Sequence, residues 1–279
     1  MSKLPDARQR RGECERIARE AAAFVRSRFG DPGEVSGKGD PSVRYDVVTE
    51  VDVLAEQLVL KLIRECAPDA FVLAEEGGMT TADGTRVDVD PCDVDELWIV
   101  DPLDGTINFA HAIPHFAVSV ACWRHGEPLA GAIADPMVGE LFSFERPGAD
   151  EQSAWRDDKR IQIVDPGDAS DSLVYVGSSA SRMPELIARF RGVRQVASAA
   201  LALAWVGAGR CGAYVQFGSL SPWDWAVGVP FVQAAGGIVT DEGGVDWPAR
   251  LTGSTGIIAA TSSIHPGIAA WAGDSTTLR

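Results

Sequence analysis

The chain has 279 residues, of which 46% are hydrophobic and 23% charged, a composition typical of an ordered globular protein. Its formal net charge of −15 at pH 7 argues against nucleic acid as a partner, because phosphate backbones are bound by clustered Lys and Arg. The same charge would repel an anionic ester unless bound cations reversed the sign locally. Taken alone, the charge indicates only an acidic soluble surface.

The cysteines and the lengths of the apolar segments indicate where in the cell the protein is located. The five cysteines are scattered, with neither a CxxC pair nor a cluster with His at zinc-ligand spacing, and this suits a reducing cytoplasm. The polar N-terminus is not followed by an apolar stretch, and nowhere do about eighteen apolar residues run together. We therefore expect a cytoplasmic protein without a signal peptide, a membrane span or a membrane partner.

The first half of the chain predicts two helices and a meander of strands. Apolar residues recur at helical spacing over residues 7–29 and 51–63. The acidic segment 79–95 is expected to be an exposed loop, and the polar segment 147–158 to join two subdomains. Short apolar runs predict strands, the later ones antiparallel, at 71–74, 97–100, 116–123, 129–134 and 141–144.

The second half alternates strands with helices, which predicts mixed α/β layers. We therefore expect an α/β (α+β) fold with two subdomains, residues 1–150 and residues 151–279. The predicted strands are 161–164, 173–176, 213–217 and 238–239, and the predicted helices are 184–190, 199–206 and 223–235.

Two aspartates, Asp101 and Asp104, follow an apolar strand, and acids at a strand end lie in a crevice. Carboxylate and carbonyl oxygens without His or Cys suit Mg²⁺, so Asp101, Asp104 and the Leu103 carbonyl are candidate ligands. If Gly105 and Thr106 open the next helix, their N–H groups would point at an anion beside the metal. For an isolated Asp-Gly pair, however, a simple turn is the better interpretation.

The whole string at residues 101–109, Asp-Pro-Leu-Asp-Gly-Thr-Ile-Asn-Phe, resembles the signature of the inositol monophosphatase family. Three further segments resemble the remaining motifs of that family in the same order, so the resemblance covers about residues 38–260. It implies a layered αβαβα sandwich of the sugar-phosphatase type with antiparallel and mixed sheets. It also implies a homodimer that hydrolyses a small phosphate monoester with two or three Mg²⁺ ions.

The resemblance also implies roles for residues in the first half. Asp52, which closes the first motif at residues 46–52, would pair with Thr106 to activate the attacking water. Glu75, in a Gly-Glu-Glu motif whose Gly is replaced by Ala74, would bridge two metals and take part in catalysis. By themselves, Asp52 could be a first-turn acid stabilised by the helix dipole, and Glu75 part of an exposed acidic pair.

Asp224 lies in the segment Pro-Trp-Asp-Trp-Ala at residues 222–226, which resembles the C-terminal motif and implies a metal ligand from the second half. Local helix chemistry explains the same residues, because Ser221, Pro222 and Asp224 form a capping box and Gly236 ends the helix. The two interpretations are compatible, since a first-turn aspartate is held rigidly and can also bind a metal. The Trp residues beside it are interpreted as packing.

The substrate side of the site is the weaker inference, because relatives with this chemistry act on inositol phosphates, fructose bisphosphate, histidinol phosphate, phosphoadenosine phosphate or NADP. The inositol branch is the nearest, which favours inositol 1-phosphate. A regulatory binding protein with a vestigial site is a further alternative, against which the intact set of acids argues. The residues implied to bind substrate are Gly105, Thr106, Ser198, Ala199, Gln216 and Asp224.

Two positions depart from the inositol branch. Gln216 stands where the branch has a Glu that accepts hydrogen bonds from sugar hydroxyls, and Ala197 stands where it usually has Gly. A neutral amide keeps a carbonyl acceptor but adds two donors and lacks the charge. The preference for a polyol could therefore shift.

Three other sequence patterns give weaker evidence about function. The Gly-x-Gly-x-x-Gly string at residues 207–212 follows a helical stretch and precedes a strand, which is the wrong context for a dinucleotide site. His111 and His115 are interpreted as structural, and no Ser-His-Asp or Cys-His arrangement supports covalent acyl chemistry. Lys38 could correspond to a mobile lysine of the family, although the segment between Lys38 and Asp52 is longer than usual.

Overall fold

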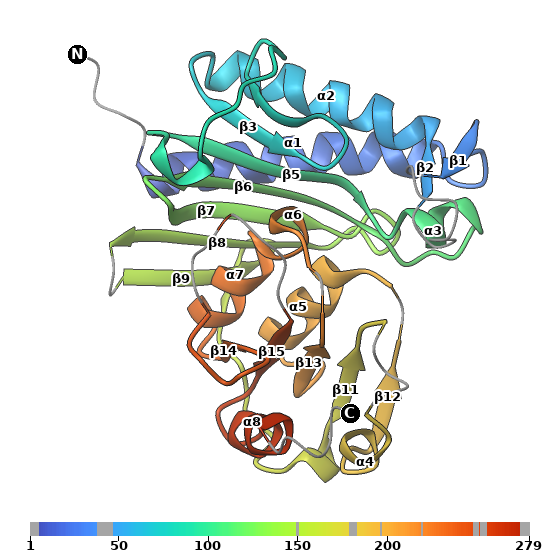
Figure 1. The fold of residues 1–279 in the computed structure, drawn as a ribbon, viewed down its shortest axis with the longest axis vertical. Helices are drawn as coiled ribbons and strands as arrows, with labels where there is room; N and C mark the ends of the chain where they lie inside the picture. Colours follow the sequence, from blue (N-terminus) through green and yellow to red (C-terminus); the bar gives the residue numbers. More distant parts are fainter. Residues whose placement is uncertain are drawn as a thin grey trace.

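The computed structural model describes residues 6–37, 47–148, 151–178, 183–195, 197–218, 220–247, 251 and 256–273, and Lys38 and Asp46 lie outside these ranges. Within them, two large sheets and their helices alternate in layers (Figure 1). The helices are α1 (Ala7–Ser27), α2 (Glu50–Cys66), α3 (Thr106–Ala110), α4 (Pro184–Ile187), α5 (Ala199–Gly207), α6 (Pro222–Trp225), α7 (Gly228–Ala234) and α8 (His265–Gly273), with 3-10 turns η1 (Pro91–Asp93) and η2 (Ala169–Asp171).

The first large sheet has eight strands, all antiparallel to their neighbours except β3 beside β5. A short hairpin of β1 (Val35–Gly37) and β2 (Val47–Thr49) precedes it. The spatial order of the sheet is β10 (Lys159–Ile161), β9 (Glu151–Arg156), β8 (Leu141–Gly148), β7 (Glu127–Ala134), β6 (Ala117–Arg124), β5 (Leu97–Asp104), β3 (Phe71–Ala74) and β4 (Gly78–Thr81).

The second large sheet has five strands and is mixed, because β11 is parallel to both of its neighbours and the other pairs are antiparallel. Both sheets therefore confirm the predicted mixed and antiparallel α/β architecture. The spatial order is β12 (Gly192–Arg194), β11 (Leu173–Val176), β13 (Ala213–Gln216), β15 (Ile257–Ala260) and β14 (Ile238–Asp241).

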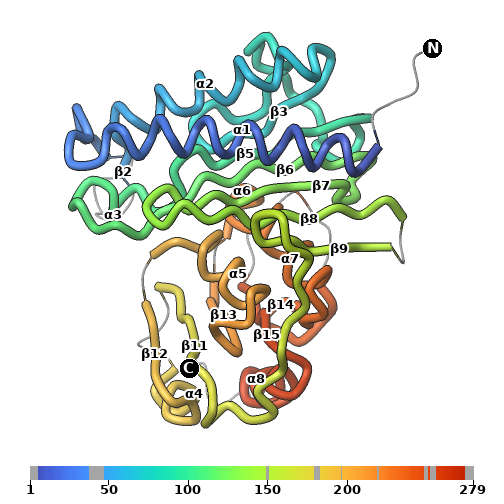
Figure 2. Tube along the Cα trace, turned by 180° about the vertical axis from the view of Figure 1, so that it is seen from behind, coloured from blue at the N-terminus to red at the C-terminus, as the bar shows by residue number. Residues whose placement is uncertain are grey.

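Strand alternation distributes the core among three layers. On β5, Trp98 and Val100 face α1 and α2, whereas Leu97 and Ile99 face the helices on the other side of the sheet. The strands of the smaller sheet also point alternately to α5 and α7 and to α4 and α8. The view from behind shows α1 and α2 running together across the first sheet, with the second half of the chain packed on its other face (Figure 2).

The long helices begin where local caps predict. Asp6 accepts a hydrogen bond from the Gln9 N–H at 2.9 Å, which caps α1, and α1 ends before Gly30 at a φ of +90°. Thr49 and Asp52 form a reciprocal capping box at the start of α2. The first-turn position expected for Asp52 is confirmed.

Several predicted elements were wrong. The segment 79–95 is not one loop, because Met79 and Thr80 pair with β3 as part of β4 and η1 follows. The segment 147–158 is not a junction, because β8 and β9 carry it through the first sheet, and the chain leaves that sheet only after β10. The helix predicted at 223–235 is split into α6 and α7, since Pro230 has no N–H to continue the hydrogen bonds of α6.

Some elements were not predicted at all. These are β1, β2, β9, β12, β15 and α8, and the strand predicted at 161–164 is β10, which ends at Ile161. Among the described residues, no helix is long and apolar enough to cross a membrane.

Candidate active site

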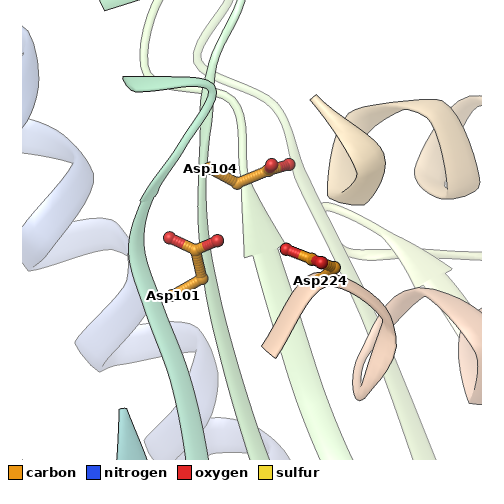
Figure 3. Close-up of side chains that lie close together, drawn as sticks. All are labelled: Asp101, Asp104 and Asp224. Atoms are coloured by element: carbon orange, nitrogen blue, oxygen red, sulfur yellow. The ribbon is translucent and has the colours of Figure 1, made fainter. Parts of the chain in front are cut away.

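Three carboxylates meet between the two halves of the chain. Asp101 and Asp104 extend from β5, and Asp224 faces them from α6 (Figure 3). One oxygen of each lies within 4.8 Å of the others. Asp101 and Asp104 are only 1% and 7% exposed, so this negative charge is concentrated where water screens it poorly.

A bulge in β5 places Asp101 and Asp104 together. Residues three apart on a regular strand point to opposite faces of the sheet. Here Asp101 pairs with Ser119 and Asp104 with Ala117, so β5 advances three residues while β6 advances two. The extra residue is a β-bulge that brings both carboxylates to the cluster.

Helix-capping contacts hold Asp224 in the cluster. The Ser221 N–H donates to Asp224 Oδ2 at 2.7 Å, which confirms the capping box predicted from Ser221, Pro222 and Asp224. Because α6 starts with this box, Asp224 has a fixed direction toward β5. The capping geometry is therefore compatible with the metal-binding interpretation of this motif.

The start of α5 contacts Asp104. Ser198 Oγ and the Ala200 N–H donate to Asp104 Oδ2 at 2.6 and 2.7 Å, and the Ala199 N–H donates to Oδ1 at 3.3 Å. Ser198 is itself 4% exposed and is the N-cap of α5. Strand β5 and helix α5 are thus joined at the carboxylate cluster.

Thr106 joins the starts of two other helices. Its Oγ1 donates to Asp52 Oδ1 at 2.7 Å and approaches the Leu103 carbonyl at 3.0 Å. Asp52 Oδ2 accepts the Thr49 N–H at 2.8 Å, so both carboxylate oxygens have partners. Gly105 precedes Thr106 as the N-cap of α3 with a φ of +100°, a conformation that favours glycine.

Glu75 directly follows β3 and lines the same cavity as the three aspartates. Among the described residues it is not one of the acids whose oxygens lie within 4.8 Å of one another. Its charge nevertheless raises the pKa of Asp101. The next residue is fixed by α2, since the Glu76 N–H donates to Glu56 Oε2 at 3.0 Å.

The pKa shifts show the cost of assembling these acids. Burial, and next the charges of Glu75, Asp104 and Asp224, raise the pKa of Asp101 well above its usual 3.8. Burial raises the pKa of Asp104 to about 6, against the lowering effect of hydrogen bonds from Ser198 and the α5 N–H groups. A divalent cation would remove the repulsion, and an all-oxygen donor set fits a hard ion such as Mg²⁺.

A cavity of about 590 Å³ opens beside the acids. Its lining includes every predicted site residue except the buried Asp52, which Thr106 contacts. A larger cavity of about 900 Å³, lined in part by Arg10 and Glu96, contains none of them. The predicted residues on the smaller cavity are Glu75, Asp101, Leu103, Asp104, Gly105, Thr106, Ser198, Ala199, Gln216 and Asp224.

One part of the cavity lining, formed by Tyr175, Tyr214 and Gln216, is neutral. The Tyr214 hydroxyl donates to Gln216 Oε1 at 2.9 Å, and a side chain at Gly177 would collide with Gln216. Burial raises the pKa of Tyr175 and of Tyr214, so both phenols stay protonated at neutral pH. This wall therefore carries hydroxyl and amide groups without formal charge.

Sequence reasoning missed several residues of this wall. Tyr175, Gly177 and Gln195 lie at the ends of β11 and β12, and their sequence context carries no motif. Trp223 lines the cavity as well as packing on the core, so the interpretation of the Trp residues as packing was incomplete. Because β12 itself was not predicted, the sequence offered no signal for Gln195.

The histidines and the glycine-rich string are accounted for by the fold. His115 shares a hydrogen bond between its Nε2 and the Tyr175 hydroxyl, and burial lowers its pKa to about 4. His115 thus supports the cavity wall as a neutral side chain, whereas His111 is exposed. The string at 207–212 lies between the end of α5 and β13, which confirms that its context is wrong for a dinucleotide site.

Comparisons with known proteins agree with this site. The profile of the inositol monophosphatase family matches residues 9–276. An inositol-1-monophosphatase from Caulobacter vibrioides is 35% identical over 90% of this chain and 96% of its own length. A Nus factor SuhB from Pseudomonas aeruginosa is 35% identical over 70% of this chain and 72% of its own.

A solved structure shares the fold. The extragenic suppressor protein suhB from Bartonella henselae superposes with a TM-score of 0.80 at 30% identity, covering 95% of this chain and 98% of that one. The match of the family profile extends through both halves of the chain, from α1 to α8. The chain belongs to the inositol monophosphatase family and is a phosphoric monoester hydrolase.

Proposed function

We propose that this enzyme hydrolyses inositol 1-phosphate to inositol and phosphate in a magnesium-dependent reaction. The observation that carries the proposal is the cluster of three carboxylates, two of them buried, beside the Thr106–Asp52 pair, on a cavity large enough for a sugar-sized ester. Two or three Mg²⁺ ions would lower the pKa of the attacking water and neutralise the phosphate oxygens. We assign the metal ligands as Glu75, Asp101, the Leu103 carbonyl, Asp104 and Asp224.

Thr106 and Asp52 would accept the proton of the attacking water. A hydroxyl has one hydrogen and two lone pairs, and we assign the Thr106 hydrogen to Asp52 Oδ1, the nearer of its two acceptors and a carboxylate. Toward water, Thr106 Oγ1 is therefore an acceptor, which orients the oxygen lone pair of that water toward phosphorus. As the water attacks phosphorus, its proton passes to Thr106 Oγ1 and the Thr106 hydrogen passes to Asp52, while the bond from phosphorus to the ester oxygen breaks and the sugar leaves as an alkoxide.

The backbone at the start of α3 would hold the phosphate. Gly105 and Thr106 open this helix beside the carboxylates, where their N–H groups would bind an anion. Gly105 fits tightly here, since a Cβ would lie 3.1 Å from the His115 carbonyl oxygen and 3.2 Å from the Ala197 carbonyl oxygen. The phosphate subsite thus depends on the close approach of three backbone segments.

The inositol ring would lie against the start of α5 and the neutral wall. We assign Ser198, Ala199, Gln216 and Asp224 to this side, because all four line the cavity. Hydroxyl groups of a polyol can donate to the Gln216 carbonyl and to the oxygen of the Tyr214 hydroxyl, whose own hydrogen is donated to Gln216. These contacts would select the leaving group after the metals and α3 have bound the phosphate.

A sugar bisphosphate is the second candidate substrate. Gln216 favours it, because an amide does not repel a second phosphate as the carboxylate of the inositol branch would. The supporting evidence is the neutral wall formed with Tyr175 and Tyr214. Histidinol phosphate and nucleotide phosphates are other esters of the same chemical class.

The test is phosphate release from inositol 1-phosphate, fructose 1,6-bisphosphate, histidinol phosphate, phosphoadenosine phosphate and NADP, with and without Mg²⁺. We expect magnesium-dependent turnover that is lost in Asp104→Asn, with the preferred ester naming the substrate. If folded, metal-loaded protein released phosphate from none of them, the phosphatase proposal would be wrong. A regulatory binding protein with a vestigial site would then be the better hypothesis, a relevant outcome because one relative is named a Nus factor.

We further propose that the enzyme is a cytoplasmic homodimer without a nucleic-acid partner. We also propose two subdomains, with the boundary after β10 rather than at residue 150, because β9 and β10 complete the first sheet. Sedimentation of the purified protein measures the oligomeric state. Limited proteolysis is expected to cut between β10 and β11 before it cuts inside either large sheet.

A further inference from the structure

Asp104 has two oxygens with different surroundings. Oδ2 receives two short hydrogen bonds, from Ser198 Oγ at 2.6 Å and from the Ala200 N–H at 2.7 Å. Oδ1 receives one longer bond, from the Ala199 N–H at 3.3 Å. A carboxylate oxygen offers about two lone-pair positions, so the donors of α5 fill Oδ2 and leave a position on Oδ1.

The same carboxylate lies in the cluster where one oxygen from each of three aspartates is within 4.8 Å of the others. A cation bound there needs an oxygen with a lone pair available, which is Oδ1. We infer that Asp104 binds metal through Oδ1 alone, while Oδ2 anchors it to the start of α5, and that Ser198 is the positioning residue. This inference rests on the proposed metal site and deepens it.

The geometry of Ser198 separates this role from ordinary helix capping. Its hydroxyl oxygen accepts a long hydrogen bond from the Leu201 N–H, at 3.4 Å. The hydroxyl hydrogen is donated to Asp104 in a much shorter one, at 2.6 Å. Hydrogen bonds to an ionised acceptor are roughly twice as strong as neutral ones. Ser198 therefore contributes more to the direction of the Asp104 carboxylate than to the first turn of α5.

The hydrogen bond between Ser198 and Asp104 is placed where its loss would weaken metal binding. Asp104 follows a bulge in β5, where the ladder to β6 is irregular, and it is only 7% exposed. Without the Ser198 hydroxyl, the carboxylate would lose one of the two donors that fix Oδ2 and could rotate away from Asp224. Hydrogen-bond partners of metal ligands typically change metal affinity by about 10 to 100-fold.

The experiment measures Mn²⁺ binding by calorimetry on the full chain carrying Ser198→Ala, Ser198→Thr or Asp6→Ala. Ser198→Thr keeps the hydroxyl. Asp6→Ala is the matched control, because it removes the N-cap of α1, which lies outside the cavity. Thermal unfolding in EDTA records what each change costs the metal-free fold, so a loss of stability is separated from a loss of affinity.

We expect Ser198→Ala to raise the Mn²⁺ Kd by about 10-fold or more, and Ser198→Thr and Asp6→Ala to stay near the wild type. A crystal structure with Mn²⁺ should show the ion on Oδ1 and the Ser198 hydroxyl on Oδ2.

Other results would overturn the inference. If Ser198→Ala lowered the unfolding temperature in EDTA but bound Mn²⁺ like the wild type, Ser198 would be only a helix cap. An ion bound to both oxygens of Asp104 would refute the division between them. If the wild type itself bound no Mn²⁺, the proposed metal site would fail as well, which distinguishes the two conclusions.

Discussion

Thr106 and Asp52 lie 54 positions apart in the sequence, yet the Thr106 hydroxyl donates to Asp52 at 2.7 Å. Each belongs to the first turn of its own helix, so the bond joins the starts of α2 and α3. Both side chains are buried, at 1% exposure for Asp52 and 9% for Thr106. The pair therefore has a defined geometry beside the carboxylates, and it can be tested by changing the hydroxyl alone.

The hydroxyl of Thr106 is expected to be essential for turnover but not for folding. Thr106→Val keeps the size of the side chain and removes the group that would pass the proton, so kcat should fall by about 100-fold or more. Thr106→Ser keeps the hydroxyl and should retain most of the activity. Steady-state kinetics and Mn²⁺ affinity are measured for both, and equal kcat values in the two variants would contradict the proton-transfer role.

Stabilisation by magnesium is expected to shrink as the pH falls. The pKa of Asp104 is raised to about 6, and that of Asp101 is also raised, so in the metal-free protein these acids bind protons more tightly when folded. Their contribution to the stability of the metal-free fold is therefore present at low pH and lost as the pH rises through the folded pKa.

Magnesium and protons compete for the same oxygens, so the metal stabilises most above about pH 6. When the Mg²⁺ concentration is about 100 times its Kd, the free energy of unfolding at pH 7.5 should rise by about 2.7 kcal/mol. The unfolding temperature should then rise by roughly 5 to 10 °C. Scanning calorimetry at pH 5.5 and 7.5 measures it. The lowered pKa of His115 makes the fold less stable as the pH falls, which is opposite to the effect of the two aspartates. This contribution is the same with and without Mg²⁺, so it cancels in the difference between the two samples.

Ala197→Gly is expected to stabilise the protein. Ala197 has a φ of +41°, in the left-handed region that costs a non-glycine residue about 1 to 2 kcal/mol. Glycine also raises the entropy of the unfolded chain, which offsets part of this relief. The free energy of unfolding should therefore rise by about 0.5 to 1 kcal/mol, which urea unfolding measures. Ala204→Gly, inside α5, is the control and should destabilise by at least about 1 kcal/mol.

Gln216→Glu is expected to move specificity toward polyols. A carboxylate would accept hydrogen bonds from inositol hydroxyls more strongly and would repel a second phosphate. We expect the ratio of kcat/KM for inositol 1-phosphate over fructose 1,6-bisphosphate to rise by about 10-fold. Hydrolysis of p-nitrophenyl phosphate, whose leaving group has neither feature, is the control, and an equal change for all three esters would rule out selection by residue 216.

Glu96→Ala is expected to destabilise the fold and leave metal affinity unchanged. Glu96 accepts hydrogen bonds from Arg10 at 2.6 Å and Arg124 at 2.8 Å, with little exposed surface on Arg10 or Glu96. Removing one partner of a buried ion pair costs about 3 to 5 kcal/mol. Glu127→Ala is the matched control, because its 3.8 Å pair with Arg146 is largely exposed on the Glu side and should cost less than about 1 kcal/mol.

The sequence by itself determined the features that depend on neighbouring residues. Strands 71–74 and 173–176 begin and end where they were predicted, because short apolar runs between turns mark buried strands. The capping boxes of α2 and α6 follow from side chains three residues apart. The string at 101–109 likewise indicated the family before any fold was known.

Only the tertiary structure decided what depends on partners far away in the chain. The polar strands β4 and β9 form because the neighbouring strands supply their hydrogen bonds, and hydrophobic periodicity gives no signal for such pairing. The bulge that brings Asp101 and Asp104 together, and the contact of Ser198 with Asp104 across 94 positions, likewise arise from packing between sheets. The sequence indicates candidate metal ligands, and we propose that long-range hydrogen bonds determine which of their oxygens bind the ion.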